Sequence, residues 1–460
     1  MDAFGNSFLH KARFPLAILF IGLVAGLGYY PMQSDFGIIA ALFIPLFILY
    51  FYIAQKSDAK AQVLFWVGVG ILVRFILLFA FPNLSDDIYR FVWDGRLIVA
   101  GINPFEQLPS HYLAVEPQIP GINQALFDDL NSPNYFTIYP PVAQTVFAGA
   151  VSVAGDNLYI SSIIMKVFLL ACEIGAIVFI LRILERLSLP IKNVLWYALN
   201  PLVIIEVMGN LHFEGAMVCF FLMSFYFLLQ SRLGIAAFAM GLSIASKLLP
   251  LMFLPSLLKR LGFKKLFIYG LITGGTVLIL FMPLLSETFI NNFGNSLDLY
   301  FRKFEFNASI YYAAREVNIY FQGWNPILYV GPVFSLLSVA YIGIETLFRQ
   351  NQSIENWLTS TLFIFTFYLC FATTIHPWYL SLPIVMCLFT PYRYPILWSG
   401  LIMMTYVNYS GIEYHENLWV VLIEYLIVFG YMIYEFRKYA PWKKRMSATK
   451  VKTELQGVHS

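Results

Sequence analysis

Long apolar stretches, separated by short polar turns, dominate this chain. A helix rises about 1.5 Å per residue, so about 20 apolar residues cross the roughly 30 Å hydrocarbon core of a bilayer. Stretches of this kind, some of them short, lie near 14–30, 36–54, 62–81, 160–183, 192–208, 213–230, 233–247, 248–260, 266–285, 325–348, 357–375, 377–392, 395–411 and 417–436. The pattern predicts an all-α, polytopic transmembrane helical bundle of about 14 spans.

Two polar segments interrupt this pattern, at about 82–158 and 286–324. Within the first, residues 139–153 are apolar as well, and we predict an interfacial helix there. The reason is the distribution of basic residues along the chain. If this stretch crossed the membrane, Arg182 and Arg186 would move to the side that otherwise carries few basic residues.

Composition supports a membrane protein. Hydrophobic residues make up 59% of the 460 residues and charged residues only 12%, whereas a soluble domain carries about 25% charge. The net charge of +3 does not indicate a nucleic-acid partner, because the basic residues follow the membrane topology. The cysteines all lie inside apolar runs, which argues against a disulfide framework or a metal cluster: Cys172, Cys219, Cys370 and Cys387.

The basic residues sort by side. With the predicted spans, one side collects Lys11, Arg13, Lys56, Lys60, Arg182, Arg186, Lys192, Arg232, Lys259, Arg260, Lys264, Lys265, Arg349, Arg393 and the tail after Arg437. The other side has basic residues only in the two long loops. This asymmetry predicts a protein of the cell (inner) membrane with cytoplasmic termini and extracytoplasmic loops. We expect one transmembrane domain over 1–440 and a cytoplasmic basic tail over 441–460.

The first loop opens with SDDIYRFVWDGRLIVAGINPFEQLP, residues 85–109. A charge at the bilayer centre costs roughly 2.5–3.5 kcal/mol, so a segment with five charges must lie at a membrane face. Ser85 can cap a helix that starts at Asp86 and carries Asp87, Arg90 and Asp94 on one side. An ordinary capped helix with an internal ion pair explains this spacing as well as a catalytic site does.

Polar residues from distant spans are expected at the same face. Asn210, His212, Glu214, Lys247 and His376 lie at predicted outer helix ends, and Arg74, Lys166 and Glu206 lie within spans near them. Ionisable groups in spans favour a functional interpretation, although single ones are often satisfied structural residues. Lys247 has no charged neighbour in sequence, so a lipid-borne phosphate is its expected partner. Trp93, Trp378 and Tyr379 are expected in the interface belt rather than as sugar platforms.

Several strings together resemble one family. SDDIYRFVWDGR, GINPFEQLP, IYPPVAQTVFAGA, LNPLVIIEVMGNLHFEGAM, SKLLPLMFLP and HPWYLSLP occur in this order over roughly residues 82–390. The ordered set is similar to GT-C fold glycosyltransferases, and closest to the polyprenyl-phosphate-mannose-dependent mannosyltransferases of bacteria. The resemblance implies a GT-C-like bundle whose large first extracytoplasmic loop is catalytic.

The resemblance also implies roles. Asp87, with Asp86 as the alternative, matches the catalytic base, and Lys247 matches a lysine that binds the donor phosphate. Arg90 and Arg74 are further candidates at the leaving phosphate, while Asp94, Asn210, His212, Glu214 and His376 are candidate substrate-binding residues. Relatives often carry His-Asn-Asp where this chain has His212, Phe213 and Glu214, so sugar and acceptor identity stay open.

The implied reaction is transfer of a hexose, with mannose expected, from a polyprenyl-phosphate-linked donor to a glycan or lipid-linked acceptor. A β-linked donor would give an α-linked product by inversion. The chain has no glycine-rich nucleotide loop, which fits a sugar that carries its own lipid-phosphate leaving group. No cofactor is assigned and no metal site, although a divalent cation could bridge Asp86 and Asp87. A secondary transporter or flippase, and a non-catalytic lipid-binding subunit, remain the alternatives.

The second loop carries a further cluster. Arg302, Lys303, Glu305 and Arg315 either line the acceptor entrance or form a solvated face. Residues 307–309 fit a glycosylation sequon, a tripeptide that also occurs by chance.

Overall fold

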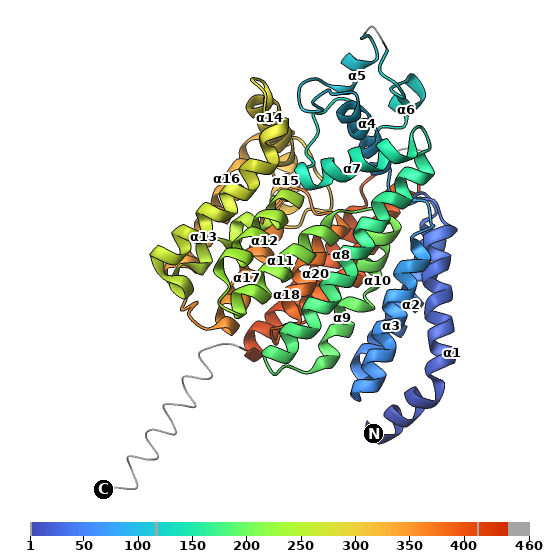
Figure 1. The fold of residues 1–460 in the computed structure, drawn as a ribbon. Helices are drawn as coiled ribbons and strands as arrows, with labels where there is room; N and C mark the ends of the chain where they lie inside the picture. The colour runs from blue at the N-terminus through green and yellow to red at the C-terminus, as the bar shows by residue number, and fades with distance from the viewer. Residues whose placement is uncertain (1, 116–117, 412–413, 440–460) are drawn as a thin grey trace.

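The computed structural model describes residues 2–115, 118–411 and 414–439, and these form a helical bundle (Figure 1). The all-α prediction is confirmed: within the described residues, strand-like pairing is confined to one isolated bridge between Phe306 and Thr374. The predicted basic tail, 441–460, lies outside the described residues.

Eight helical segments of the described chain are long and apolar enough to cross a membrane. They are Lys11–Tyr29 in α1 (Asp2–Tyr29), α2 (Phe36–Lys56), α3 (Lys60–Leu77), α8 (Leu158–Arg186), Leu249–Leu284 around α13 (Leu258–Phe281), α16 (Ile327–Leu347), α17 (Ile354–Phe371) and α20 (Leu418–Tyr439). A bent pair, Ile191–Ala198 and Pro201–Gly209, adds a ninth if it counts as one span. The chain is therefore a multi-pass membrane protein.

The predicted number of about 14 spans exceeds what helix length supports. Several predicted spans are short helices, α11 (Glu214–Leu229), α12 (Leu233–Ser246) and the run Pro377–Cys387; at 1.5 Å per residue, 14 to 16 residues reach only about 21–24 Å. The predicted spans 248–260 and 266–285 fall within one candidate segment. That segment leaves helical geometry at Gly262, with φ 73° and ψ 163°. A glycine accepts this positive φ without steric cost, so an apolar run that looks like two spans is one helical segment with a sharp bend.

The helices of the two long loops lie at one end of the bundle, which we call the loop end (upper part of Figure 1). Those of the two loops are α4 (Asp87–Val99), α5 (Pro109–Tyr112), α6 (Gln124–Asp128), α7 (Pro141–Ala154), α14 (Phe289–Arg302) and α15 (Ile310–Gln322). Those that link spans are η1 (Ile191–Val194), α9 (Leu195–Ala198), α10 (Pro201–Val203), the π-helix η2 (Ile204–Gly209), η3 (Leu249–Phe253), η4 (Pro255–Leu257), η5 (Met282–Leu284), η6 (Pro377–Leu380), α18 (Ser381–Cys387), α19 (Tyr394–Leu401) and η7 (Ile402–Tyr409). Helix α1 begins, and α20 ends, at the opposite end of the bundle (Figure 1).

Close packing of α4 on α7 fixes the start of the first loop. The rings of Phe91 and Phe147 stack with centroids 4.4 Å apart, and a Cβ on Gly95 would lie 2.7 Å from the carbonyl oxygen of Phe147. Only glycine permits so close an approach of the two backbones. The apolar stretch predicted at 139–153 is thus the helix α7, which holds α4 in place.

Candidate active site

A cavity of about 230 Å³ opens at the loop end. Its charged and titratable lining comes from separate parts of the chain and includes several tyrosines together with Asp86, Asp87, Arg90, Lys247 and His376. Asp87 and Lys247, far apart in sequence, therefore face one common space. Phe304, Phe306, Trp378 and Tyr379 give the same cavity an aromatic wall.

A second cavity, of about 700 Å³, has a different lining. It includes Arg349, Arg393 and Lys438, with Glu355 as its one acidic residue and no histidine. Arg393 is already bonded through Nη1 to the carbonyl oxygens of Cys387, Thr390 and Tyr392. Acid–base chemistry needs a carboxylate or an imidazole near the reacting hydroxyl. The loop-end cavity combines two carboxylates and a histidine with a lysine, so it is the candidate site.

Asp87 lies at the first position of α4, with Asp86 as the residue before the helix. The sequence predicted the start one residue earlier, so only Asp87 is in the first turn. Its carboxylate accepts hydrogen bonds from Nδ2 of Asn131 at 2.7 Å and from the hydroxyl of Tyr139 at 3.0 Å. Both donors are neutral and belong to the cavity wall. Asp87 is thus held in a defined orientation without a neutralising cation on it.

Asp86 faces the cavity beside Asp87. Burial among the walls, and next the charges of Asp87 and Asp129, raise the pKa of Asp86 above its ordinary value. The Asp86 side chain is nevertheless exposed to water, since it lines an open cavity. Two neighbouring carboxylates on one cavity wall suit an arrangement in which one serves as the base.

Lys247 closes another side of the cavity. Its ammonium lies 2.7 Å from Oε1 of Glu214, which is fully buried at the start of α11. The expectation that only a ligand phosphate would partner this lysine is therefore wrong, because Glu214 partners it inside the protein. The ammonium also faces the rings of Tyr139 and Tyr379, at 6.0 and 5.8 Å from their centroids. A cation between a carboxylate and an open cavity can bind an incoming anion.

His212 lies behind Asp87 in the bundle. Nε2 is 3.7 Å from Oδ2 of Asp87, and Nδ1 is 3.0 Å from Oε2 of Glu206. Asn210 donates to Glu206 at 3.0 Å, and the hydroxyl of Tyr406 donates to its other oxygen at 3.0 Å. Asn210, His212 and Glu206 are buried and do not line the cavity. They are placed to act on Asp87 rather than on substrate.

Trp378 joins the two histidines of the site. Its ring stacks on His212 with centroids 3.7 Å apart and on His376 at 4.4 Å. Burial, and next the charges of Lys247 and His212, lower the pKa of His376 well below its ordinary value. The predicted interface-belt role is wrong for Trp93, which is fully buried, and Trp378 and Tyr379 line the cavity instead.

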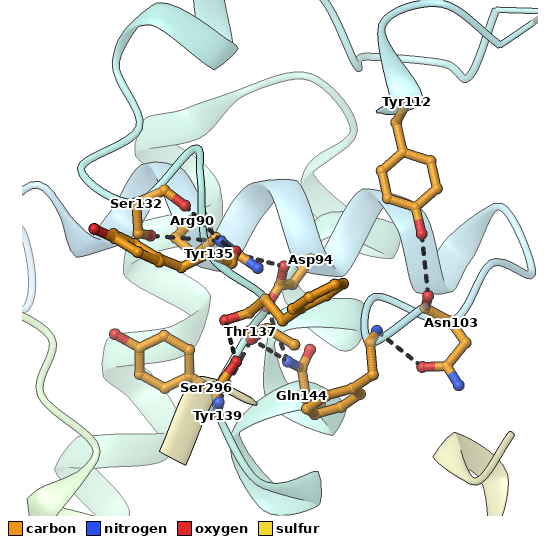
Figure 2. A network of polar contacts seen from close by, with 12 residues as sticks. Arg90, Asp94, Asn103, Tyr112, Ser132, Tyr135, Thr137, Tyr139, Gln144 and Ser296 are labelled. Carbon is orange, nitrogen blue, oxygen red and sulfur yellow. Dashed lines mark hydrogen bonds and ion pairs between the residues drawn. The ribbon is translucent and has the colours of Figure 1, made fainter. Parts of the chain in front are cut away.

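Arg90 and Asp94 form a positioning network (Figure 2). Nε of Arg90 donates to Asp94 at 2.9 Å, while Nη1 donates to the carbonyl oxygens of Ser132 and Tyr135, each at 3.0 Å. Asp94 also accepts from Gln144 at 2.9 Å. The predicted ion pair is present, but its charges hold the 132–135 segment beside the cavity. Asp94 is fully buried, so the structure does not support it as a substrate-binding residue.

Arg74 is placed away from the cavity. Its Nε lies 2.8 Å from Oε2 of Glu173, and its Nη1 donates to the carbonyl oxygens of Gly70 and Ala198. Both charged side chains are fully buried. The pairing with Glu173 and the absence of Arg74 from the cavity lining argue against the predicted role of Arg74 at the donor phosphate. Lys166 is similarly bonded to carbonyl oxygens of Leu77, Ala80 and Gly209 and ties the end of α3 to the end of η2.

The second loop contributes aromatic rather than charged residues to the cavity. Phe304 and Phe306 line it, whereas Glu305 and Arg315 pair with each other. Lys303 is exposed, and the side chain of Arg302 is outside the described residues. Asn307 of the sequon is fully buried and donates to Glu424, so it is inaccessible for glycosylation in the folded protein.

Sequence reasoning missed several residues of the site. Asn131, Tyr139, Tyr406 and Tyr409 were not singled out, although Tyr139 lies in the quoted string IYPPVAQTVFAGA. Within the described residues, no three histidine, cysteine or acidic side chains are arranged to hold a metal ion. A divalent cation bridging Asp86 and Asp87 therefore stays a prediction.

Comparison with known proteins agrees with these motifs. The family model described as "Alpha-(1->6)-mannopyranosyltransferase, N-terminal domain" matches residues 38–261, which include Asp87, His212 and Lys247. Alpha-(1->6)-mannopyranosyltransferase A of Corynebacterium glutamicum is 27% identical over 174 residues, covering 36% of this chain and 33% of the relative. The chain thus spans about a third of that relative's length, and no solved structure matches. Over residues 38–261, just under half of the chain, the sequence is thus similar to the alpha-(1->6)-mannopyranosyltransferase family, as its motifs predicted.

Proposed function

We propose that the chain transfers a mannosyl residue from a polyprenyl-phosphate-linked donor to a hydroxyl of a glycan or lipid-linked acceptor. The observation that carries this proposal is the shared cavity of Asp87 and Lys247. Asp87 takes the proton of the acceptor hydroxyl as general base. Lys247 binds the donor phosphate and stabilises the charge that develops on it as the sugar departs. Attack opposite the leaving phosphate inverts a β-linked donor to an α-linked product.

Size and lining of the cavity support a sugar at this place. About 230 Å³ accommodates a hexosyl unit and its phosphate, while the polyprenyl chain stays in the lipid beside the bundle. The aromatic side chains offer apolar faces to the C–H groups of a sugar ring, and Arg90 keeps the 132–135 wall in place.

The proposal includes an orientation. Basic residues at the end opposite the loop end include Lys192, Arg349, Arg393 and Lys438. Under the positive-inside rule this end is cytoplasmic, so both termini are cytoplasmic and the cavity faces outward in the cell membrane. We also propose that residues 1–440 act as one catalytic domain, since the cavity draws on α4, Lys247, η6 and η7.

The test is transfer of radiolabelled mannose from a polyprenyl-phosphate donor by the purified chain in lipid nanodiscs, with a panel of mannose-terminated acceptors. Asp87→Asn should lower transfer about 10²–10⁴-fold. Asp129→Asn removes a nearby exposed acid and is the matched control, with expected transfer close to that of the unmodified protein.

Two results would contradict the proposal. If Asp87→Asn transfers at the normal rate while Asp86→Asn is inactive, Asp86 is the base. If the protein moves solute across sealed vesicles and forms no mannosylated product from any donor, it is a transporter.

A further inference from the structure

The imidazole of His212 lies between two carboxylates that belong to different helices. Asp87 starts α4 and Glu206 lies on η2, and each approaches a different ring nitrogen. His212 and Glu206 are buried, whereas Asp87 reaches the cavity. A carboxylate–imidazole–carboxylate row therefore leads from the cavity into the protein interior.

The carboxylate–imidazole–carboxylate row can take up one more proton. A carboxylate only accepts hydrogen bonds, and Glu206 lies closer to Nδ1, at 3.0 Å, than Asp87 lies to Nε2, so we assign the proton of neutral His212 to Nδ1 on distance alone. Nε2 then turns a lone pair toward the Asp87 carboxylate, and two acceptors face each other across 3.7 Å. Neither nitrogen makes a hydrogen bond of good geometry in this state. A hydrogen bond between the Asp87 carboxylate and Nε2 of His212 can form only when one of the two carries a proton.

The local backbone holds this geometry at a conformational cost. Helix η2 is a π-helix, in which Asn210 donates back to the carbonyl oxygen of Ile205. Leu211 follows with φ 66°, a left-handed conformation that disfavours a leucine. Such irregular segments cluster at functional sites, because the fold must stabilise them elsewhere. Here Lys166 binds the carbonyl oxygen of Gly209 and fixes the end of η2.

Carboxylates are the charged groups in contact with the His212 ring. Asp87 and Glu206 are acidic, and Tyr406 is a neutral donor to Glu206. His376 lies on the far face of Trp378, and its lowered pKa keeps it uncharged. Lys247 supplies one nearby positive charge, which Glu214 neutralises, and Lys166 supplies another at the carbonyl oxygen of Gly209. The two carboxylates are the charged groups that contact the ring itself.

We propose that His212 and Glu206 are positioning residues that receive, through Asp87, the proton released by glycosyl transfer. This inference rests on the proposed function. In the transfer step, the acceptor O–H bond breaks and its oxygen bonds to the sugar carbon, while the bond from that carbon to the phosphate oxygen breaks. The electron pair leaves with the phosphate, and the proton passes to Asp87 and then to Nε2 of His212. Glu206 stabilises the resulting imidazolium.

The decisive variant is Glu206→Gln, which keeps the shape of the side chain and removes its charge. We expect kcat to fall about 10–100-fold, with the donor KM nearly unchanged because Glu206 does not line the cavity. The acidic limb of the kcat-against-pH profile should shift to lower pH, since the imidazole loses the charge that favours its protonation. Glu435→Gln, a buried carboxylate bonded to the backbone of Arg393 and Tyr394, is the control and should leave the profile unchanged.

Each outcome is decisive. A Glu206→Gln profile superimposable on that of the unmodified protein overturns the inference, even if kcat falls together with thermal stability, because that result describes a structural role. A His212→Gln protein that retains normal kcat and its acidic limb overturns it as well. If the unmodified protein transfers no mannose from any donor, the proposed function fails, and this inference fails with it.

Discussion

The ion pair of Lys247 and Glu214 allows the structural and the ligand-binding role of one lysine to be separated. Their charged atoms lie 2.7 Å apart, with 18% of the Lys247 side chain exposed and none of Glu214. At this distance the direct attraction is about 6 kcal/mol for an effective dielectric constant of about 20, and desolvation offsets a large part of it. Removing the lysine leaves a buried, uncompensated carboxylate. We expect Lys247→Met to cost about 3–5 kcal/mol of stability.

A double-mutant cycle then separates the two roles. Glu214→Gln/Lys247→Met removes both charges, so thermal unfolding should return most of the way to that of the unmodified protein. Donor binding should not return, because the cation at the phosphate is still absent. A charge-assisted hydrogen bond contributes about 1.5–3 kcal/mol, so the donor KM should remain raised by roughly 10–100-fold in both variants.

The matched control is an ion pair of similar length on the surface. Lys192 and Asp58 are 2.6 Å apart, with side chains 35% and 54% exposed. Lys192→Met should cost less than about 1 kcal/mol, since solvent screens exposed pairs. Two results would refute the reasoning. Lys247→Met as stable as Lys192→Met would contradict the buried pair, and a double variant with normal donor KM would mean that Lys247 acts only by neutralising Glu214.

Two further predictions concern the start of α4. Because the folded protein raises the pKa of Asp86, the protonated acid is favoured in the folded state, and its stabilisation is lost as pH rises through that pKa. Asp86→Asn should therefore raise the unfolding temperature at neutral pH, with the difference vanishing below about pH 4; a constant difference across pH would contradict the shift. Gly95→Ala places a Cβ 2.7 Å from the carbonyl oxygen of Phe147 and should cost about 1–3 kcal/mol in thermal unfolding. Gly149→Ala on α7 meets no atom within 4 Å, so equal losses in the two variants would exclude the steric explanation.

Local patterns predicted the helix at Asp87 and the Arg90–Asp94 pair, because both depend on residues within two turns of each other. The partners of Arg74 and Lys247 could not be predicted in this way. Glu173 and Glu214 lie on other helices, and only the packing of α3 on α8 and of α11 on α12 brings each pair together. The sequence indicated that Arg74 and Lys247 lie near the site, but it did not identify the acids that neutralise them.

The predicted number of spans was too high for a related reason. Hydropathy reports that a stretch is apolar, but not how far its backbone extends. The bend at Gly262, the π-helix η2 and the 3-10 segment η7 change the rise per residue or the direction of the chain. None of these features alters the apolar composition from which spans were counted.

Hydrogen-bond satisfaction differs among the buried acids and histidines of the bundle. Asp94 and Glu173 each accept bonds from two side chains, so their charges are committed to holding helices in register. The nitrogens of His212 and Nδ1 of His376 are buried as well but lack bonds of good geometry. Leaving such a group unsatisfied costs about 1–3 kcal/mol, and both rings stack on Trp378, which lines the cavity. A fold that satisfies Asp94 and Glu173 and leaves these two imidazoles short of partners keeps their capacity to take up a proton, which a transfer site requires.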